Sequence, residues 1–440
     1  MTDALAAGLA TALLAGPWEP VSMNRRCREA VGRTRTPAWM RTLTAEVLAL
    51  HHRPPLDAPR ELAALLVLLP SWDRAAPSRR GMRIVHWHPT PTVMRETAWP
   101  VSRLDDVAAL ARLLDLDTAE LAWFADVRAL EREAAPALRH YRIEARPKRA
   151  GGLRVLEVPK PRLREIQRRL LRHVLTPIPL HDAAHGCAPG RGVATALAPH
   201  AGHGVVLRFD LAAFFACLAA GRVWGVLRSA GYPEAVAHAV TGLVTTSISR
   251  AAWSALPMPT GDRAGAHREL GRWLAHPHLP QGAPTSPALA NLVAYALDVR
   301  LAGLARSLGC AYTRYVDDLI FSGPDLPANV LRRRVPEIVV EEGFRVAPVK
   351  TVLLSRAGRQ QVLGAVVNDR LSIPRPEYDR LRAVLHNCAV HGVDTQAGGV
   401  PVGTFRARLA GRVARVNGLD VARGARLRAA FDLIEWPPDA

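Results

Sequence analysis

Three aspartates lie where their carboxylates could be held rigidly for metal chemistry. Asp210 closes the apolar stretch 205–209, which predicts a strand. Asp317 and Asp318 lie between the stretches 311–315 and 319–322, which predict a hairpin. Three carboxylates brought together repel one another unless a cation joins them. The sequence therefore predicts a site for a hard cation, and Mg²⁺ is the expected ion.

The segment between the aspartates strengthens this interpretation. Alone, an aspartate before Phe214-Phe215 fits a strand end that packs aromatic rings, and a lone Asp-Asp pair fits a polar turn. Here Asp210 and the Asp317-Asp318 pair lie on either side of the segment 279–287, whose sequence is L-P-Q-G-A-P-T-S-P. Two divalent ions about 3.5–4 Å apart can hold the attacking and leaving oxygens of a phosphoryl transfer. The order of the segments favours phosphodiester chemistry.

The charge of the chain points to a polyanionic partner. The 440 residues include 58 Lys+Arg and 39 Asp+Glu, a formal net charge of +19. Such a chain binds nucleic acid well because each neutralised phosphate releases counterions. An acidic membrane surface is the alternative partner. A codon usage that favours arginine would explain the excess charge without any partner. Only Lys148, Lys160 and Lys350 are lysines. An ammonium can lose its proton near neutral pH where a guanidinium cannot, so these three are weak functional signals.

The elements that must position these residues form an α/β (α+β) pattern in three parts. We expect a helical N-terminal extension over 1–135, a mixed part with antiparallel strands over 136–374, and a helical part over 375–440. The expected helices are 38–51, 59–69, 104–114 (capped by Ser102), 118–133, 162–175, 232–248, 286–308, 329–342, 406–415 and 421–434, and the expected hairpins pair 141–145 with 154–158, 311–315 with 319–322, and 361–367 with 370–373.

Other classes of protein fit less well. The five cysteines are scattered, odd in number and free of C-x-x-C pairs, which is typical of a reducing cytoplasm. No apolar run reaches the roughly 18 residues of a membrane span, so we expect a soluble cytoplasmic protein without a membrane partner. No nucleotide-binding glycine loop follows a strand. The spacing of His181, His185 and Cys187 could suit zinc, but a fourth ligand is missing and a structural role is favoured.

The three segments resemble the palm motifs of bacterial reverse transcriptases, especially the retron type. The segments are F-D-L-x-x-F-F at 209–215, L-P-Q-G-x-x-x-S-P at 279–287 and Y-x-D-D-L at 315–319. The similarity extends from Tyr141 to Asn387 and includes 147–154, 159–167 and 362–368. This resemblance implies a right-hand polymerase: an RNA-directed DNA polymerase (a nucleotidyltransferase) with fingers, palm and a small helical thumb.

The resemblance also implies roles at the metal site. Asp210 and Asp317 would be catalytic and ligate two Mg²⁺ ions, with Mn²⁺ as a substitute. The backbone carbonyl of Leu211 would help to hold the nucleotide-bound ion, and Asp318 would support the site. Lys350 would lie near the pyrophosphate and could protonate it; the alternative is a plain surface lysine.

Further residues would bind the nucleotide and the nucleic acid. Lys148 and Arg154 would clasp the triphosphate, and the ring of Phe215 would collide with a ribose 2′-OH and so select deoxynucleotides. Gln281 and Gly282 would line the nucleotide pocket and the template path. The helix 162–175 has arginines at its exposed positions, so we expect Arg162, Arg164 and Arg168 to contact the nucleic-acid backbone; a solvated face is the alternative.

The expected partners are an RNA template and primer, the DNA product and dNTPs, with a cognate non-coding RNA and an effector protein if the chain serves anti-phage defence. Two elements depart from the retron pattern: of N-A-x-x-H only His200 is present, and V-T-G is replaced by Val362-Leu363-Gly364. The alternatives are a template-independent, defence-associated relative, a group II intron maturase, a diversity-generating enzyme and a non-catalytic RNA-binding scaffold. The absence of nuclease motifs argues against the maturase, and the presence of all three aspartates argues against the scaffold.

Overall fold

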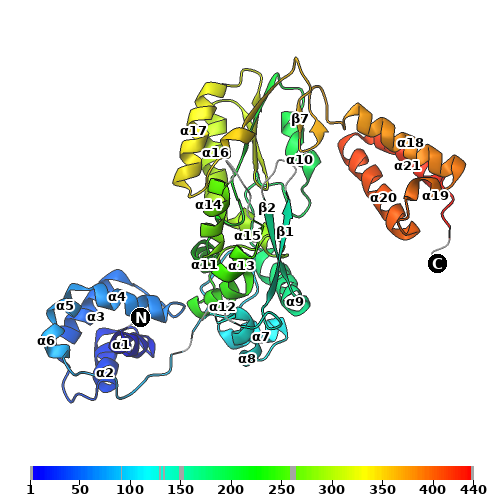
Figure 1. The fold of residues 1–440 in the computed structure, drawn as a ribbon. Coiled ribbons are helices and arrows are strands. Elements are labelled where there is room, and N and C mark those ends of the chain that lie inside the picture. Colours follow the sequence, from blue (N-terminus) through cyan, green and yellow to red (C-terminus); the bar gives the residue numbers. More distant parts are fainter. Residues whose placement is uncertain are drawn as a thin grey trace. The chain divides into compact units, whose positions relative to one another are not determined.

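The computed structural model describes residues 3–90, 92–127, 130–131, 134–147, 153–257 and 264–437 (Figure 1). The chain divides into two compact units. Unit 1 combines Met1–Pro179 with Phe215–Leu289, and unit 2 combines Leu180–Phe214 with Ala290–Ala440. Helices and antiparallel strand pairs occur together, which confirms the α/β (α+β) fold class.

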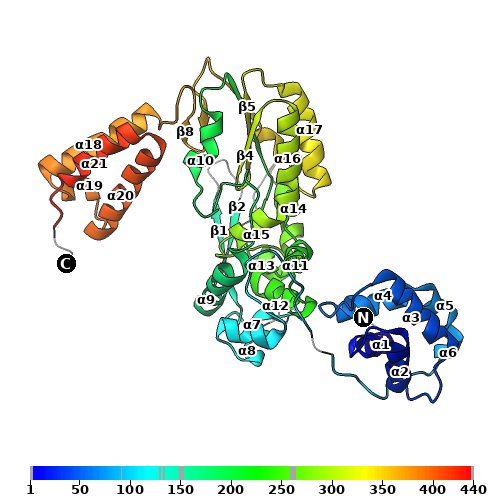
Figure 2. The ribbon, with the colours of Figure 1, turned by 180° about the vertical axis from the view of Figure 1, so that it is seen from behind.

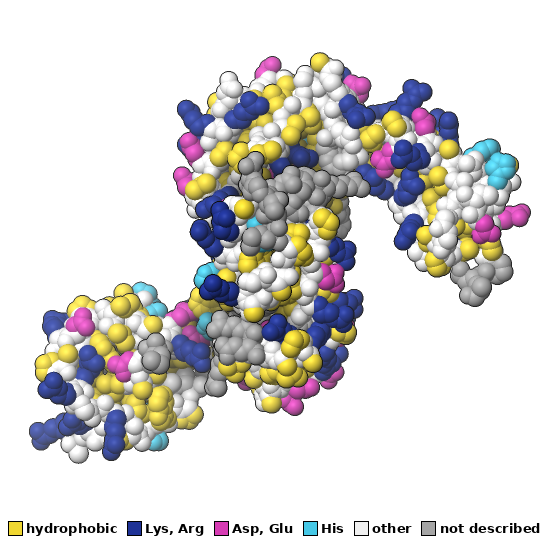
Figure 3. Space-filling view, viewed as in Figure 1, with side chains coloured by type: hydrophobic (Ala, Val, Ile, Leu, Met, Phe, Trp, Pro, Cys, Tyr) yellow, Lys and Arg dark blue, Asp and Glu magenta, His cyan; other side chains and the backbone are white. Residues whose placement is uncertain are grey.

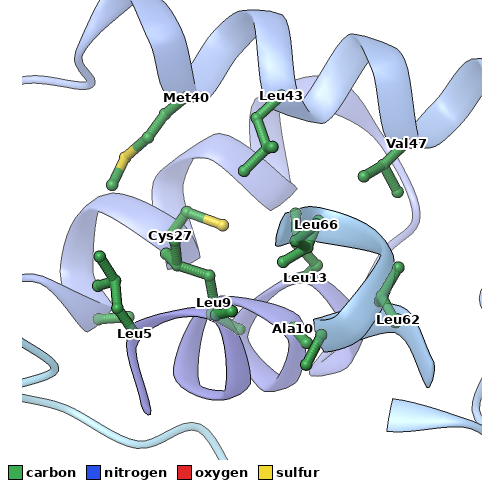
Figure 4. Packing of buried hydrophobic residues seen from close by; sticks show 14 of the residues in the cluster. Leu5, Leu9, Ala10, Leu13, Cys27, Met40, Leu43, Val47, Leu62 and Leu66 are labelled. Carbon is green, nitrogen blue, oxygen red and sulfur yellow. The ribbon is translucent and has the colours of Figure 1, made fainter. Parts of the chain in front are cut away.

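The N-terminal part of unit 1 is a helical cluster. Its helices are α1 (Ala4–Leu14), α2 (Pro20–Ala30), α3 (Ala38–Leu50), α4 (Pro59–Leu68), α5 (Pro70–Arg74) and α6 (Ala76–Arg79). Asp3 caps α1, and Leu9 and Leu13, one helical turn apart, point into a core shared with Met40 and Leu66 (Figure 4). Burial of each such side chain contributes about 1.5–3 kcal/mol, so the cluster has a core of its own.

The rest of unit 1 holds the first hairpin and the basic helix. β1 (Tyr141–Pro147) pairs with β2 (Leu153–Pro159) in antiparallel register, which confirms the expected hairpin. The basic helix α9 (Pro161–Leu170) ends in a π-helical turn, Leu171–Leu175. The remaining helices of this part are α7 (Val107–Leu114), α8 (Thr118–Ala125), α11 (Ala220–Ser229), α12 (Glu234–Val244), α13 (Arg250–Ser254) and α14 (Ala264–Leu274).

Unit 2 is built on a four-stranded antiparallel sheet with the order β4-β5-β3-β6. The strands are β3 (Val205–Asp210), β4 (Ala311–Tyr315), β5 (Asp318–Gly323) and β6 (Val352–Ser355). Successive side chains of a strand point to opposite faces. Phe209 and Phe321 therefore share one face, where their rings pack edge to face, and Asp210 and Asp318 share the other.

Helices cover both sides of this sheet. In Figures 1 and 2, α16 (Tyr295–Ser307) and α17 (Ala328–Glu341) lie on one side, and α10 (Val193–Leu197) lies on the other. After β6 come the short hairpin β7 (Gln361–Val362) and β8 (Ala365–Val366) and the helices α18 (Arg375–His391), α19 (Asp394–Ala397), α20 (Val402–Leu419) and α21 (Val421–Asp432). Leu381, Leu385, Leu409 and Val413 of these helices belong to one buried cluster.

Several local expectations were wrong. The helix expected from residue 104 begins at Val107 under the cap of Asp106, and Ser102 instead donates a hydrogen bond to the carbonyl of His173. The next helix ends at Ala125, because Asp126 adopts a left-handed conformation.

Two further segments differ from their patterns. The stretch 286–308 is two helices, α15 (Ser286–Val293) and α16, bent by 52° at their break. The hairpin expected across Asn368-Asp369 does not form as a ladder: only one bridge, between Val366 and Ser372, joins the two stretches. The hairpin observed here turns at Leu363-Gly364, where φ is 50° and 76°. In the described part of the chain no single helix is long and apolar enough to span a membrane; α15 and α16 pass that test only as a bent pair.

Candidate active site

The predicted aspartates meet at one end of the sheet of unit 2. Asp210, the last residue of β3, lies directly opposite Asp318, the first residue of β5. The N–H of Leu211 donates a 2.8 Å hydrogen bond to the carbonyl of Asp317. Backbone pairing therefore brings Asp210 beside Asp317 and Asp318, which lie more than 100 positions later in the sequence.

A buried ion pair supports the turn that carries Asp317. Val316 has a φ of 57°, an uncommon conformation for a β-branched residue. Arg314 Nη1 donates to the carbonyl of Val316 at 3.1 Å, and Arg314 Nη2 lies 2.6 Å from Oδ2 of Asp298 in α16. Asn291 Oδ1 accepts from Arg314 Nη1 at 2.9 Å. Both charged side chains are fully buried, so the turn is attached to a rigid network.

Sequence reasoning missed Arg314 and Asp298. A signal for the first exists, because an arginine within a short apolar strand needs a partner when that strand is buried. The position of Asp298 on α16 gives no comparable signal, because one acidic residue on a helix is usually exposed.

Two cations accompany the carboxylates. Lys350 Nζ lies 2.8 Å from both carboxylate oxygens of Asp210, and Arg208 Nε lies 3.4 Å from Oδ1 of Asp318. Burial raises the pKa of Asp318 to about 6; Arg208 lowers it, whereas Asp317 and Asp210 add to the rise. The charged form of Asp318 is therefore costly here, which favours a bound cation.

The donor atoms are of the type that a hard divalent cation prefers. Oδ1 of Asp318 is buried without a hydrogen-bond partner, and within the described ranges the carbonyl of Leu211 accepts no hydrogen bond. The side chains do not, however, form a ready-made cage: the described residues contain no group of three or more His, Cys, Asp or Glu side chains that could hold a metal ion. The ammonium of Lys350 is paired with the carboxylate of Asp210. Because the Lys350 side chain is 56% exposed, it can move away from that carboxylate.

In unit 1, four predicted residues line one hollow of about 420 Å³. They are Arg164 and Arg168 of α9, Phe215 and Gly282, joined by Pro284 and Pro287. Gly282 has a φ of 137°, and a Cβ there would lie 3.0 Å from the carbonyl oxygen of Glu157, so only glycine fits easily. The hollow combines two guanidinium groups with an aromatic ring, which suits a phosphate-bearing ligand.

The remaining predicted residues of unit 1 are placed differently. Gln281 is tied to β2, because its carbonyl accepts a 2.9 Å hydrogen bond from the N–H of Glu157. Arg154 is exposed on β2, opposite Arg146, whereas Lys148 lies outside the described residues. Arg162 is exposed and donates to the carbonyl of Asp115, and it does not line the hollow.

A second buried pair lies beside this loop, and the sequence did not reveal it. His278 Nε2 lies 2.9 Å from Oε2 of Glu157, and each side chain is 1% exposed. Burial lowers the pKa of His278, but the hydrogen bond and charge of Glu157 outweigh that effect and raise it. The pair joins β2 to the residue that precedes Leu279-Pro280-Gln281-Gly282, and so helps to fix that loop.

Comparisons with known proteins identify the family of the chain. A family model described as reverse transcriptase (RNA-dependent DNA polymerase) matches residues 146–367. The chain is 41% identical over 294 residues to the retron Mx65 reverse transcriptase of Myxococcus xanthus, covering 66% of this chain and 64% of that protein. It is 38% identical to the retron Mx162 reverse transcriptase of the same organism, covering 67% and 61%, and 29% identical to the retron Ec86 reverse transcriptase of Escherichia coli, covering 53% and 65%.

The chain thus spans slightly less than two thirds of the length of these relatives. Among solved structures, telomerase from Candida albicans with a fragment of telomeric RNA aligns at a TM-score of 0.35 and 13% identity, over 85% of this chain and 70% of that one.

Proposed function

The chain belongs to the reverse transcriptase family, and from this premise we propose that it is an RNA-directed DNA polymerase, which extends a primer with deoxynucleotides. The observation that carries the proposal is the pairing of Asp210 with Asp318, with Asp317 bonded to the residue after Asp210. Rigid strand ends of this kind can hold carboxylates at fixed positions, as metal-assisted phosphoryl transfer requires.

Asp210 and Asp317 would hold two Mg²⁺ ions, or Mn²⁺ in their place, with the carbonyl of Leu211 and with Asp318 close by. Divalent ions held there would stabilise the charge that develops on the attacking and leaving oxygens. Lys350 must first leave Asp210, and its freed ammonium could then give a proton to the departing pyrophosphate.

Residues of unit 1 would bind and select the nucleotide. Arg154, with Lys148, would bind the triphosphate, and the ring of Phe215 would exclude a ribose 2′-OH. Gln281 would line the nucleotide pocket. Arg164 and Arg168 line the same hollow as Phe215 and Gly282, which supports a path for nucleic acid along this surface; Arg162 would extend that path along α9.

We extend the proposal to the template and purpose. The proposed template is a structured, cognate RNA, and the proposed role of the DNA product is anti-phage defence through an effector protein; the similarity to retron reverse transcriptases supports the retron type. Sequencing the nucleic acid that copurifies with the protein, before and after ribonuclease treatment, would test this. A single RNA covalently or stably joined to DNA is expected, whereas random cellular RNA would contradict it.

Primer extension on an RNA template with dNTPs and Mg²⁺ tests the activity. Wild type should extend the primer and Asp317→Asn should not. Asp325→Asn is a matched control, because Asp325 is exposed, forms no ion pair with the described residues and lies eight positions away. Product from wild type without template would favour untemplated synthesis. Equal product from wild type and Asp317→Asn would refute the assignment of the site, and absence of product with every primer and with copurified RNA would favour the scaffold.

A further inference from the structure

The N-terminal helices carry a basic hollow outside the segment that the family model matches. Its volume is about 650 Å³, and its walls come from the loop between α2 and α3, the start of α3, and α5 with α6. Residues 3–90 contain twelve arginines against seven acidic residues. Figure 3 shows dark-blue side chains, all of them arginines here, projecting along the edge of this cluster that carries α5 and α6. The surface therefore favours an anionic ligand.

Three guanidinium groups line the hollow, those of Arg33, Arg35 and Arg74, and none of its lining residues is acidic. Arg33 and Arg35 are exposed and form no ion pair with any described residue. Arg74 lies 3.5 Å from Oε1 of Glu46, and its side chain is 71% exposed. Glu46 is already occupied, because Oε2 accepts hydrogen bonds from the N–H and the hydroxyl of Ser71. Positive charge thus remains available to a ligand.

The loop that presents two of these arginines is fixed. Gly32 has a φ of 64°, and the N–H of Arg33 donates to the carbonyl of Arg28 in the last turn of α2. Such a left-handed glycine after a helix is a standard C-terminal cap. The backbone at Arg33 is therefore preorganised, which reduces the entropic cost of binding.

An aromatic side chain completes the hollow. Trp39 lines it, packs edge to face against Trp72, and has a buried indole Nε1 with no hydrogen-bond partner among the described residues. Buried tryptophan N–H groups usually have an acceptor. Trp39 is half-buried and keeps part of its surface in the hollow. Arginines beside such an aromatic side chain suit single-stranded nucleic acid, because phosphates pair with the cations and bases stack on the ring.

We propose that this hollow binds a short stretch of single-stranded RNA: Arg33, Arg35 and Arg74 contact its phosphates, and Trp39 contacts a base. This contact is separate from the proposed polymerase site, and it anchors RNA on the N-terminal helices. It is independent of base sequence, since phosphate contacts carry no sequence information.

The test uses the full chain and a fluorescent, unstructured 20-nucleotide RNA. Binding is measured between 50 and 300 mM salt for wild type, Arg33→Ala/Arg35→Ala and the control Arg25→Ala/Arg53→Ala. The control removes the same charge from exposed arginines that do not line the hollow. For single strands the slope of log K against log salt is about −0.7 per phosphate contact. Loss of two contacts in Arg33→Ala/Arg35→Ala should therefore reduce the magnitude of the slope by about 1.4, and the control should leave the slope unchanged.

A second readout locates the RNA directly. Photo-crosslinking with 4-thiouridine should label peptides that contain Trp39 or residues 71–82, and the label should be lost in Arg33→Ala/Arg35→Ala. Equal slope changes in both double variants, or no crosslink in these peptides, would overturn the proposal. Binding of free AMP is measured for the same variants. Loss of AMP binding in Arg33→Ala/Arg35→Ala without a change in the RNA slope would also overturn the proposal, because the hollow would then hold a free nucleotide. Primer extension on a short primer–template should be unchanged in the hollow variant, which keeps this test distinct from that of polymerase activity.

Discussion

Asp298→Asn should weaken unit 2 and slow DNA synthesis, although Asp298 is not a proposed ligand of metal or nucleotide. The substitution keeps the shape of the side chain but leaves the guanidinium of Arg314 buried without its counter-charge; both side chains are 0% exposed. Breaking such a buried pair costs about 3–5 kcal/mol. Hydrogen exchange of the β4 and β5 amides, followed with urea denaturation, should report the loss.

A double replacement separates stability from positioning. Asp298→Leu/Arg314→Met removes both charges, so much of the lost stability should return. The carbonyl of Val316 nevertheless loses its donor, Arg314 Nη1. A hydrogen bond to a charged group contributes about 1.5–3 kcal/mol, so the rate of primer extension should stay about 10- to 100-fold below wild type if this bond orients the turn.

Two results would refute this reasoning. The control is Arg300→Ala, which breaks ion pairs to Glu341 and Glu342 at a side chain that is 38% exposed, and it should leave hydrogen exchange of β4 and β5 near wild type. If Asp298→Asn has no larger effect than this control, the buried pair does not stabilise the sheet. If the double replacement restores both stability and full activity, the contact to Val316 does not position Asp317.

Four further substitutions test other parts of the site. His278→Gln should remove a part of the stability that depends on pH. Burial lowers the pKa of His278, but Glu157 raises it above 6.5. The pair therefore stabilises the fold fully below pH 6.5 and progressively less as the pH rises through the raised pKa. Urea midpoints of wild type and variant should converge from pH 5.5 to pH 8.5, and a constant difference would contradict this. Gly282→Ala should cost about 1–3 kcal/mol and slow primer extension, because the φ of 137° and the nearby carbonyl of Glu157 oppose a Cβ; unchanged urea midpoints would contradict the strain. Phe215→Ala should increase ribonucleotide incorporation relative to deoxynucleotides about 10-fold or more in competition assays, and an unchanged ratio would rule out the steric role. Lys350→Arg should keep the charge beside Asp210 but lower the single-turnover rate about 10²–10⁴-fold, and a rate equal to wild type would show that Lys350 is not the acid.

Much of the fold was predictable because it depends on local periodicity. Short apolar stretches placed β3, β4 and β5 within one residue of their observed bounds, and a polar Asp-Asp between two of them gave the hairpin. The register of the strand pair, which the structure supplies, then places Asp210 and Asp318 on the same face of the sheet. The boundaries expected at 135 and 374 and the roles of the site residues stay predictions.

Other local features gave no readable signal. The break between α15 and α16 falls at Ala294, a residue that normally favours helix, and Leu363 adopts a left-handed conformation that its type disfavours. The β6 strand and helices α11 and α14 were missed: β6 has only four residues, and two glycines interrupt each helix. Tertiary packing overrides propensity at such positions.

The sequence by itself placed Asp210 at the end of a strand and Asp317 and Asp318 in a hairpin turn, because strand and hairpin patterns depend on only a few neighbouring positions. The tertiary structure alone decided which charges meet. Lys350 pairs with Asp210, which lies 140 residues earlier in the sequence, and His278 pairs with Glu157, which lies 121 residues earlier. Arg314 pairs with Asp298 on a helix that packs beside its strand. A buried charge without a partner is costly, so each of these pairs forms where the fold brings two opposite charges together, and no local pattern records that choice.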